Sequence, residues 1–242
     1  MENFTGNKNL TLETSDNKRR EFLKKGLLFG TLSGVAGISL VTGCSDDGEA
    51  DVSPAEDLMR EHGVLNRIML IYDACKLHLV NGDQFPLEIV QNSALIVQNF
   101  IENYHEKLEE KFLFPRFAKA GQMLELVQTL FIQHAAGRKI TEQIIQFGKM
   151  KTLADAGESQ KLVKLLNDFN MMYRPHAARE DTILFPAFKK IISKNEYFGL
   201  GEDFEKKEHE LFGSEGFEST VEKVLTIEKQ LGIDDLSKFN AQ

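Results

Sequence analysis

A thirteen-residue motif occurs twice in this chain, and it constrains the fold more than any other feature. Residues 105–117 read HEKLEEKFLFPRF, and residues 176–188, 71 positions later, read HAAREDTILFPAF. Each copy has His, then Glu four residues on, then Leu-Phe-Pro and a further Phe. Two single histidines, His62 and His134, precede the copies and stand 72 residues apart. The repeated unit is therefore a lone His followed by a His-x-x-x-Glu motif.

Helical geometry gives this spacing a meaning, because residues i and i+4 lie one turn apart on the same face of a helix. His105 with Glu109, and His176 with Glu180, can each present an imidazole and a carboxylate to a common point. Burying such groups unpaired costs on the order of several kcal/mol each, so a metal ion is the expected partner. For either pair alone the alternative is a satisfied core histidine or a solvated pair, but the duplication favours metal. The other residues on the two faces are apolar: Val97, Ile101, Leu108 and Phe112, and then Phe169, Tyr173 and Ile183.

Composition and periodicity predict an all-α protein. Hydrophobic residues make up 42% and charged residues 27% of the chain, as in ordinary globular proteins. The net charge of −8 offers no basic surface, so we exclude nucleic acid as a partner. The pattern predicts an up-down-up-down four-helix bundle over residues 54–193, with one histidine on each helix. We expect the helices at about 54–79, 86–114, 122–150 and 160–192, with Pro115 ending or kinking the second and Pro175 kinking the fourth. Residues 194–242 are expected to form a C-terminal extension with one short helix at about 218–231.

Residues 1–43 have the features of an export signal. Residues 18–25, KRREFLKK, resemble a twin-arginine motif, and an apolar, glycine-rich run follows at 26–43. Residues 41–44, VTGC, resemble a bacterial lipobox in which Cys44 is acylated. We therefore expect a lipoprotein held at the membrane of the cell envelope by its lipid, with residues 44–53 as a linker. Residues 44–49 also resemble the acidic tag of lipoproteins on the outer-membrane surface. The alternatives are a membrane-anchor helix for 26–43 and a plain solvated linker for the tag.

Residues 55–192 resemble the hemerythrin-like (HHE cation-binding) domain family. The resemblance implies a four-helix bundle around a non-haem di-iron centre with two iron ions, bridged by an oxo or hydroxo group. It implies His62 and His105 on one iron, His134 and His176 on the other, and Glu109 and Glu180 as bridging carboxylates. Glu106 resembles an extra carboxylate ligand of carboxylate-richer members. Zinc or manganese is the less favoured occupant.

The chain departs from the oxygen-carrying members of that family at two positions. Their third histidine on the third helix is replaced by Arg138, which either contacts a carboxylate or lies on the surface. Their final Asp ligand corresponds in spacing to Asp181, but we take Glu180 as the ligand because it repeats Glu109. Outside the repeat, Cys75 is expected to be a buried thiol, with a redox role as the alternative. His209 is expected on the surface or in packing, with a place in the site as the alternative.

Three functions are compatible with these features. The favoured one is an envelope-anchored di-iron protein that binds, senses or scavenges dioxygen, peroxide, nitric oxide or iron. The second is a di-iron oxidoreductase of the peroxidase, oxidase or nitric-oxide-reducing type. It would need an external electron donor, whose identity the sequence leaves unknown, because the chain contains no flavin, haem or rubredoxin-type motif. The third is a bundle in which the metal is only structural.

Overall fold

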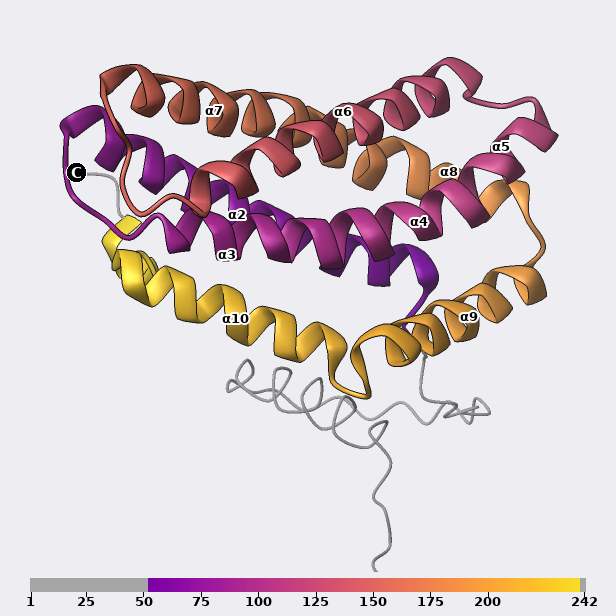
Figure 1. Cartoon of the computed structure of the whole chain (residues 1–242). Coiled ribbons are helices and arrows are strands. Elements are labelled where there is room, and N and C mark those ends of the chain that lie inside the picture. The colour runs from indigo at the N-terminus through magenta and orange to yellow at the C-terminus, as the bar shows by residue number, and fades with distance from the viewer. Residues whose placement is uncertain (1–51, 240–242) are drawn as a thin grey trace, which may run out of the picture. The chain divides into compact units, whose positions relative to one another are not determined.

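The computed structural model describes residues 52–239, and these residues form helices and no β-strand (Figure 1). The all-α prediction is therefore confirmed for this part of the chain. The helices, with π-helical and 3₁₀ segments labelled η, are α2 (Pro54–Asn81), α3 (Glu88–Ile96), η2 (Val97–His105), α4 (Glu106–Leu108), η3 (Glu109–Leu113), α5 (Phe114–Ala120), α6 (Leu124–Gly148), α7 (Ala156–Arg179), η4 (Glu180–Leu184), α8 (Phe185–Ile191), α9 (Lys194–Phe212), α10 (Gly216–Leu231) and η5 (Leu236–Phe239).

The first helix has strong local signals at both ends. The Ser53 side chain accepts a hydrogen bond from the Glu56 amide, and the Glu56 carboxylate accepts one from the Ser53 amide. This capping box satisfies amides that the first turn leaves unpaired, and Pro54 adds a fixed φ angle. Gly82 ends α2 in the left-handed region at φ 76°, which glycine adopts at no steric cost. The predicted start at residue 54 is confirmed, and the helix ends at Asn81, close to the predicted end at about 79.

The helix that carries the first motif does not end at Pro115, although such an end was one of the two outcomes that we expected there. It runs without a break from α3 to α5, and the Leu-Phe-Pro segment is accommodated by a π-helical turn. The Phe114 amide donates to the carbonyl of Glu109, five residues back. In the second copy the Phe185 amide donates to Glu180 in the same way. Since proline has no N–H and its ring crowds the carbonyl four residues back, widening the turn keeps the chain helical.

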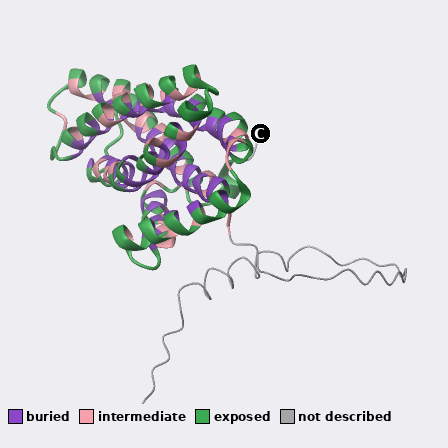
Figure 2. Ribbon diagram, turned by 90° about the vertical axis from the view of Figure 1, so that its right-hand side faces the viewer, coloured by how far each residue is buried: buried purple, intermediate pink, exposed green. Residues whose placement is uncertain are grey.

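The long helices pack side by side around an apolar core. α2 packs against α7, α3 packs against α6, and α6 packs against α7. Figure 2 shows the buried residues on the inward-facing sides of the helices and the exposed ones on the outside. The buried residues along α2 and α6 include Leu58, His62, Leu65, Met69, Tyr72, Leu130, His134, Thr141 and Ile145. Ile183 was predicted wrongly, because it lies in η4, where the wider turn leaves it 45% exposed.

The C-terminal extension contains more helix than predicted. The expected helix at 218–231 is present as α10, but the 19-residue helix α9 before it was missed. α10 packs on α2 and α3, and α9 packs on α2. Arg67 of α2 donates to both carboxylate oxygens of Glu228 of α10, at 2.8 and 2.5 Å. The extension is therefore part of the folded body.

The predicted export signal, the lipobox with Cys44 and most of the 44–53 linker lie outside the described residues. These features and the domain boundaries drawn from them stay predictions. Within residues 52–239, no helix has both the length and the apolar character needed to cross a lipid bilayer.

Candidate metal centre

Two groups of buried side chains form the centre of the bundle. His62, His105 and Glu109 make one group, and His134, His176 and Glu180 make the other. Within each group, one ligand atom from each residue lies within 4.8 Å of the others. All six residues are at most 3% exposed. The structure thus brings together the histidines in the two pairs that the resemblance to hemerythrin-like proteins implies.

Each of the two glutamates faces one histidine of each group. Glu180 Oε2 lies 3.1 Å from His176 Nε2 and 3.4 Å from His62 Nε2. Glu109 Oε2 lies 3.8 Å from His105 Nε2 and 3.4 Å from His134 Nε2. A carboxylate between two pairs of imidazoles can reach both sides of the centre with its two oxygens.

Several donor atoms here have no hydrogen bond to protein. They are both carboxylate oxygens of Glu109, both of Glu180, and Nε2 of His105 and His134. Buried polar atoms are rarely left unpaired, because each costs about 1–3 kcal/mol. A mixed set of imidazole nitrogens and carboxylate oxygens suits first-row transition metals. The two His/Glu groups therefore fit a cation, and they could hold a metal ion.

The other ring nitrogen of each histidine is held by a partner. Nδ1 of His62 pairs with Asp181 at 2.7 Å, His105 with Glu61 at 2.6 Å, His134 with Glu110 at 3.2 Å, and His176 with Gln133 at 2.9 Å. Such partners fix the tautomer and the ring orientation of metal-binding histidines. With Nδ1 held, every Nε2 is directed at the centre.

These four partners follow the sequence repeat, although sequence reasoning missed them. Glu61 and Gln133 each come just before the lone histidine of their copy, and Glu110 and Asp181 each come just after the repeated glutamate. In each pair, the partner residue and the histidine that it holds lie on different helices. Their matching positions in the two copies could have pointed to these residues. Which histidine each one holds depends on how the helices pack.

Comparison with known proteins indicates a cation-binding domain, as do the sequence repeat and the geometry of the two His/Glu groups. Residues 53–188, more than half of the chain, match the family described as the hemerythrin HHE cation-binding domain. The chain belongs to the hemerythrin family. It is also 42% identical over 191 residues to "Uncharacterized protein Rv1995" of Mycobacterium tuberculosis and "Uncharacterized protein Mb2018" of Mycobacterium bovis, covering 79% of this chain and 75% of each relative. No solved structure gives a significant match.

In this hemerythrin domain, burial and pairing set the charges of the histidines. Burial lowers the pKa of His105 well below its usual value and that of His134 to about 4. Both rings are therefore neutral at physiological pH, the form that binds metal. Burial also opposes protonation of His62, but its contacts with Asp181 and Glu180 raise its pKa to about 9.

The pKa values of the two central carboxylates, Glu109 and Glu180, are shifted in opposite directions. Burial, followed by repulsion from Glu180, raises the pKa of Glu109 well above its usual value. Burial acts in the same direction on Glu180, but His176 and His62 lower its pKa below the usual range. Two carboxylates this close cannot both ionise easily without a compensating positive charge. A bound cation would supply that charge.

Glu106 has a different environment from the other predicted ligands. Tyr173 Oη donates to Glu106 Oε1 at 2.8 Å, and Arg138 Nη2 donates to Oε2 at 2.6 Å. Arg138 also donates to Glu110 at 2.5 Å, so it faces the site rather than the surface. Glu106 lies within 4.8 Å of ligand atoms of Glu110 and His134, whereas its sequence neighbour His105 belongs to the group of His62 and Glu109. Burial raises the pKa of Glu106 to about 8.

The remaining predicted residues lie outside the centre. Cys75 is buried, and burial raises the pKa of its thiol to about 12. His209 lies on α9 with its side chain 38% exposed, 4.0 Å from Glu205. Asp181 is a neighbour of the centre, as expected, and holds the ring of His62.

Proposed function

We propose that this protein is a di-iron protein of the hemerythrin family that binds a small ligand such as dioxygen, peroxide or nitric oxide. The observation that carries the proposal is the position of Glu109 and Glu180, each between imidazoles of both groups. In the proposed assignment, His62 and His105 hold one ion, His134 and His176 hold the other, and the two glutamates bridge them. Two iron ions would supply redox activity and open positions for the ligand.

We also assign the helices of the family's bundle. The four antiparallel helices would be α2, the continuous segment α3–α5, α6, and the continuous segment α7–α8. The packing of α2 on α7, α3 on α6 and α6 on α7 supports this arrangement. α9 and α10 would then be additions on one side of the bundle.

The chain's own residues give one side of the centre a distinct character. Arg138 neutralises Glu106 and Glu110 beside His134, and the Tyr173 hydroxyl holds Glu106 from the other side. A guanidinium near the centre favours an anionic ligand electrostatically. Glu106 is thereby held in place by two donors, one on each carboxylate oxygen.

Optical spectroscopy tests this function. We expect the anaerobic ferrous protein to show a reversible absorption change when it meets dioxygen or nitric oxide. The double variant His134→Ala/His176→Ala should lose the change, and the exposed control His209→Ala should keep it. Sustained turnover of peroxide or nitric oxide with an added electron donor would instead support an oxidoreductase. A bound zinc ion with no response to any ligand would support a structural metal.

We further propose that the protein is a lipoprotein of the bacterial cell envelope, exported by a twin-arginine-type route. The order of the arginine pair, the apolar run and the VTGC sequence supports it. A Cys44→Ala variant should then appear in the soluble fraction rather than the membrane fraction. Incorporation of labelled fatty acid should require Cys44, and labelling of the variant would contradict the proposal.

A further inference from the structure

An acidic cluster lies beside the His/Glu centre, between the bundle and the C-terminal extension. It consists of Asp57 and Glu61 of α2 and Glu208 of α9. One carboxylate oxygen from each residue lies within 4.8 Å of the others. Their exposed fractions are 7%, 1% and 1%. Three carboxylates buried this deeply need positive charge or protons.

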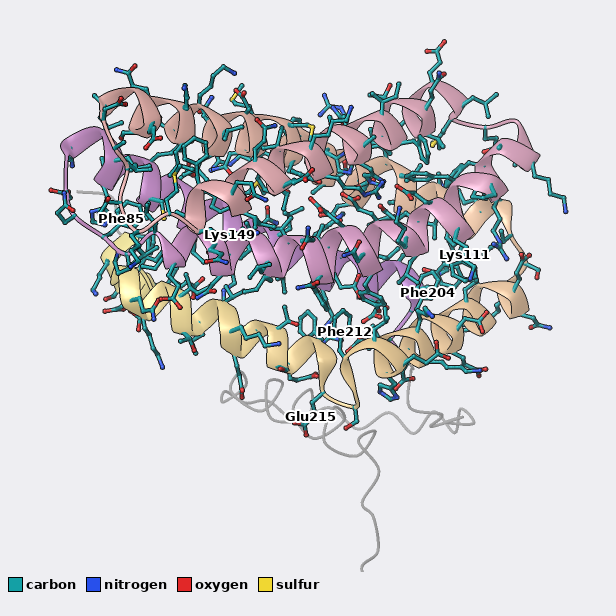
Figure 3. All side chains as sticks on the ribbon, in the orientation of Figure 1. Phe85, Lys111, Lys149, Phe204, Phe212 and Glu215 are labelled. Atoms are coloured by element: carbon teal, nitrogen blue, oxygen red, sulfur yellow. The ribbon has the colours of Figure 1, made fainter. Side chains whose placement is uncertain are left out.

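Helix α9 is fixed on both sides of Glu208. Phe204 packs against Phe112, and Phe212 packs edge-on against Tyr104, with ring centroids 5.5 Å apart in both pairs. Figure 3 shows the labelled Phe204 and Phe212 side chains pointing from α9 toward the helices of the bundle. Glu208 Oε1 also accepts a hydrogen bond from the Phe217 amide at 2.8 Å. The Glu208 carboxylate is therefore held in place by packing.

A buried phenol faces the same cluster. Tyr104 is 1% exposed, and Glu61, Asp57 and Glu208 all raise the pKa of its hydroxyl, after burial itself. Its hydroxyl lies against Glu61, but neither Tyr104 Oη nor Glu61 Oε1 has a hydrogen bond of normal geometry. Tyr104 Oη and Glu61 Oε1 thus face each other at the cluster, and neither makes a well-aligned hydrogen bond to any other group. Buried oxygens in this position can be satisfied by a bound ion or water.

The repeat shows that orienting a histidine does not by itself require the charge of Glu61. Glu61 holds Nδ1 of His105, and the matching residue of the second copy, Gln133, holds Nδ1 of His176 with a neutral amide. An uncharged side chain is therefore sufficient to orient the histidine. The carboxylate of the first copy faces Asp57 and Glu208, where the second copy has no counterpart of α9. Arg60 lies 3.5 Å from Asp57 at the edge of the cluster, with its side chain 30% exposed.

We propose that Asp57, Glu61 and Glu208, with the Tyr104 hydroxyl, form a separate site for a divalent cation that prefers oxygen ligands, such as Mn²⁺, Mg²⁺ or Ca²⁺. Carboxylate-rich, nitrogen-free sites select these ions. The site goes beyond the proposed function, because none of its carboxylates belongs to the two His/Glu groups. Through Glu61 it is one hydrogen bond away from His105. It also joins the extension to α2.

Manganese binding tests the site. The free Mn²⁺ in a titration of metal-stripped protein can be counted by its electron paramagnetic resonance signal. We expect wild type to bind one Mn²⁺ more per chain than Glu208→Gln, or to bind it at least about tenfold more tightly. The control Glu202→Gln, an exposed carboxylate on the same helix, should match wild type. Equal binding by wild type and Glu208→Gln would overturn the site.

Two further variants keep the result unambiguous. Asp57→Asn should show the same loss, and it decides the question if circular dichroism shows that Glu208→Gln does not fold. His134→Ala/His176→Ala should bind less metal at the His/Glu centre but keep the ion that Glu208→Gln loses. Failure of the acidic site and failure of the His/Glu centre therefore give different patterns.

Discussion

At the scale of single residues, the centre depends on what holds the far nitrogen of each histidine. Three of the four partners are carboxylates, from Glu61, Glu110 and Asp181, and the fourth is the amide of Gln133. A carboxylate partner makes an imidazole more basic and a better ligand than an amide does. The two halves of the centre are therefore similar in shape but unequal in charge.

Removing one of these partners should weaken metal binding without touching a proposed ligand. Asp181→Ala frees Nδ1 of His62, so we expect metal affinity to fall about 10- to 100-fold. Competition with a chromogenic chelator measures the change. Thr182→Ala, at the exposed neighbouring position, is the matched control and should leave affinity unchanged. An unchanged affinity in Asp181→Ala would show that His62 needs no orienting partner.

Cys75 should be chemically inert in the folded protein. Its thiol is fully buried, and burial raises its pKa to about 12, so the reactive thiolate is scarce at pH 8. In a Cys44→Ser background, we expect alkylation of Cys75 by iodoacetamide only after the protein is unfolded. Mass spectrometry counts the modified chains. Rapid labelling of the native protein would contradict the structure and favour a redox role.

At the scale of helices, the approach of α6 to α7 determines where Tyr173 lies. A Cβ atom added at Gly137 of α6 would sit 2.0 Å from Tyr173 Oη and 2.7 Å from the nearest carbon of its ring. Only glycine therefore permits the hydrogen bond from Tyr173 to Glu106. The site is shaped by this missing side chain as well as by its polar groups.

A pair of glycine substitutions tests this contact. Gly137→Ala should destabilise the fold by about 1–3 kcal/mol, because Tyr173 must move. Gly63→Ala, in the middle of α2 with no atom within 4 Å of the added Cβ, should instead stabilise by up to about 1 kcal/mol. Urea unfolding followed by circular dichroism gives both values. Equal effects at the two positions would show that the α6–α7 contact is looser than described.

The helices also show what sequence patterns could and could not predict. Apolar periodicity and the positions of glycine and proline were sufficient to predict an all-helical fold, and the resemblance to hemerythrin-like proteins implied the grouping of the histidines. The π-helical turns were missed because a regular period of 3.6 residues per turn was assumed. For the same reason Ile183 was expected on the inward face of its helix. α9 was missed although Ser193 caps it and Tyr197, Leu200 and Phe204 follow a helical period. Its charged composition and its glycines at 199 and 201 concealed that pattern, and only packing shows that Glu208 is buried.

At the scale of the whole molecule, the described residues bury two kinds of candidate cation site next to one another. The His/Glu centre lies inside the repeat, and the acidic cluster lies where the added helix α9 meets α2. Glu61 connects them by its hydrogen bond to His105. The repeat accounts for the first site, and the extension that follows the repeat accounts for the second.

The iron content of the intact protein tests the central claim most directly. The protein is loaded with ferrous iron under anaerobic conditions and separated from unbound iron by gel filtration. Its iron content per chain is then measured by elemental mass spectrometry. We predict two tightly held iron ions per chain in wild type and in the exposed control His209→Ala, and a loss of both in His62→Ala/His176→Ala, which removes one imidazole from each group. Wild type with less than one ion, or the double variant with both ions retained, would contradict the account.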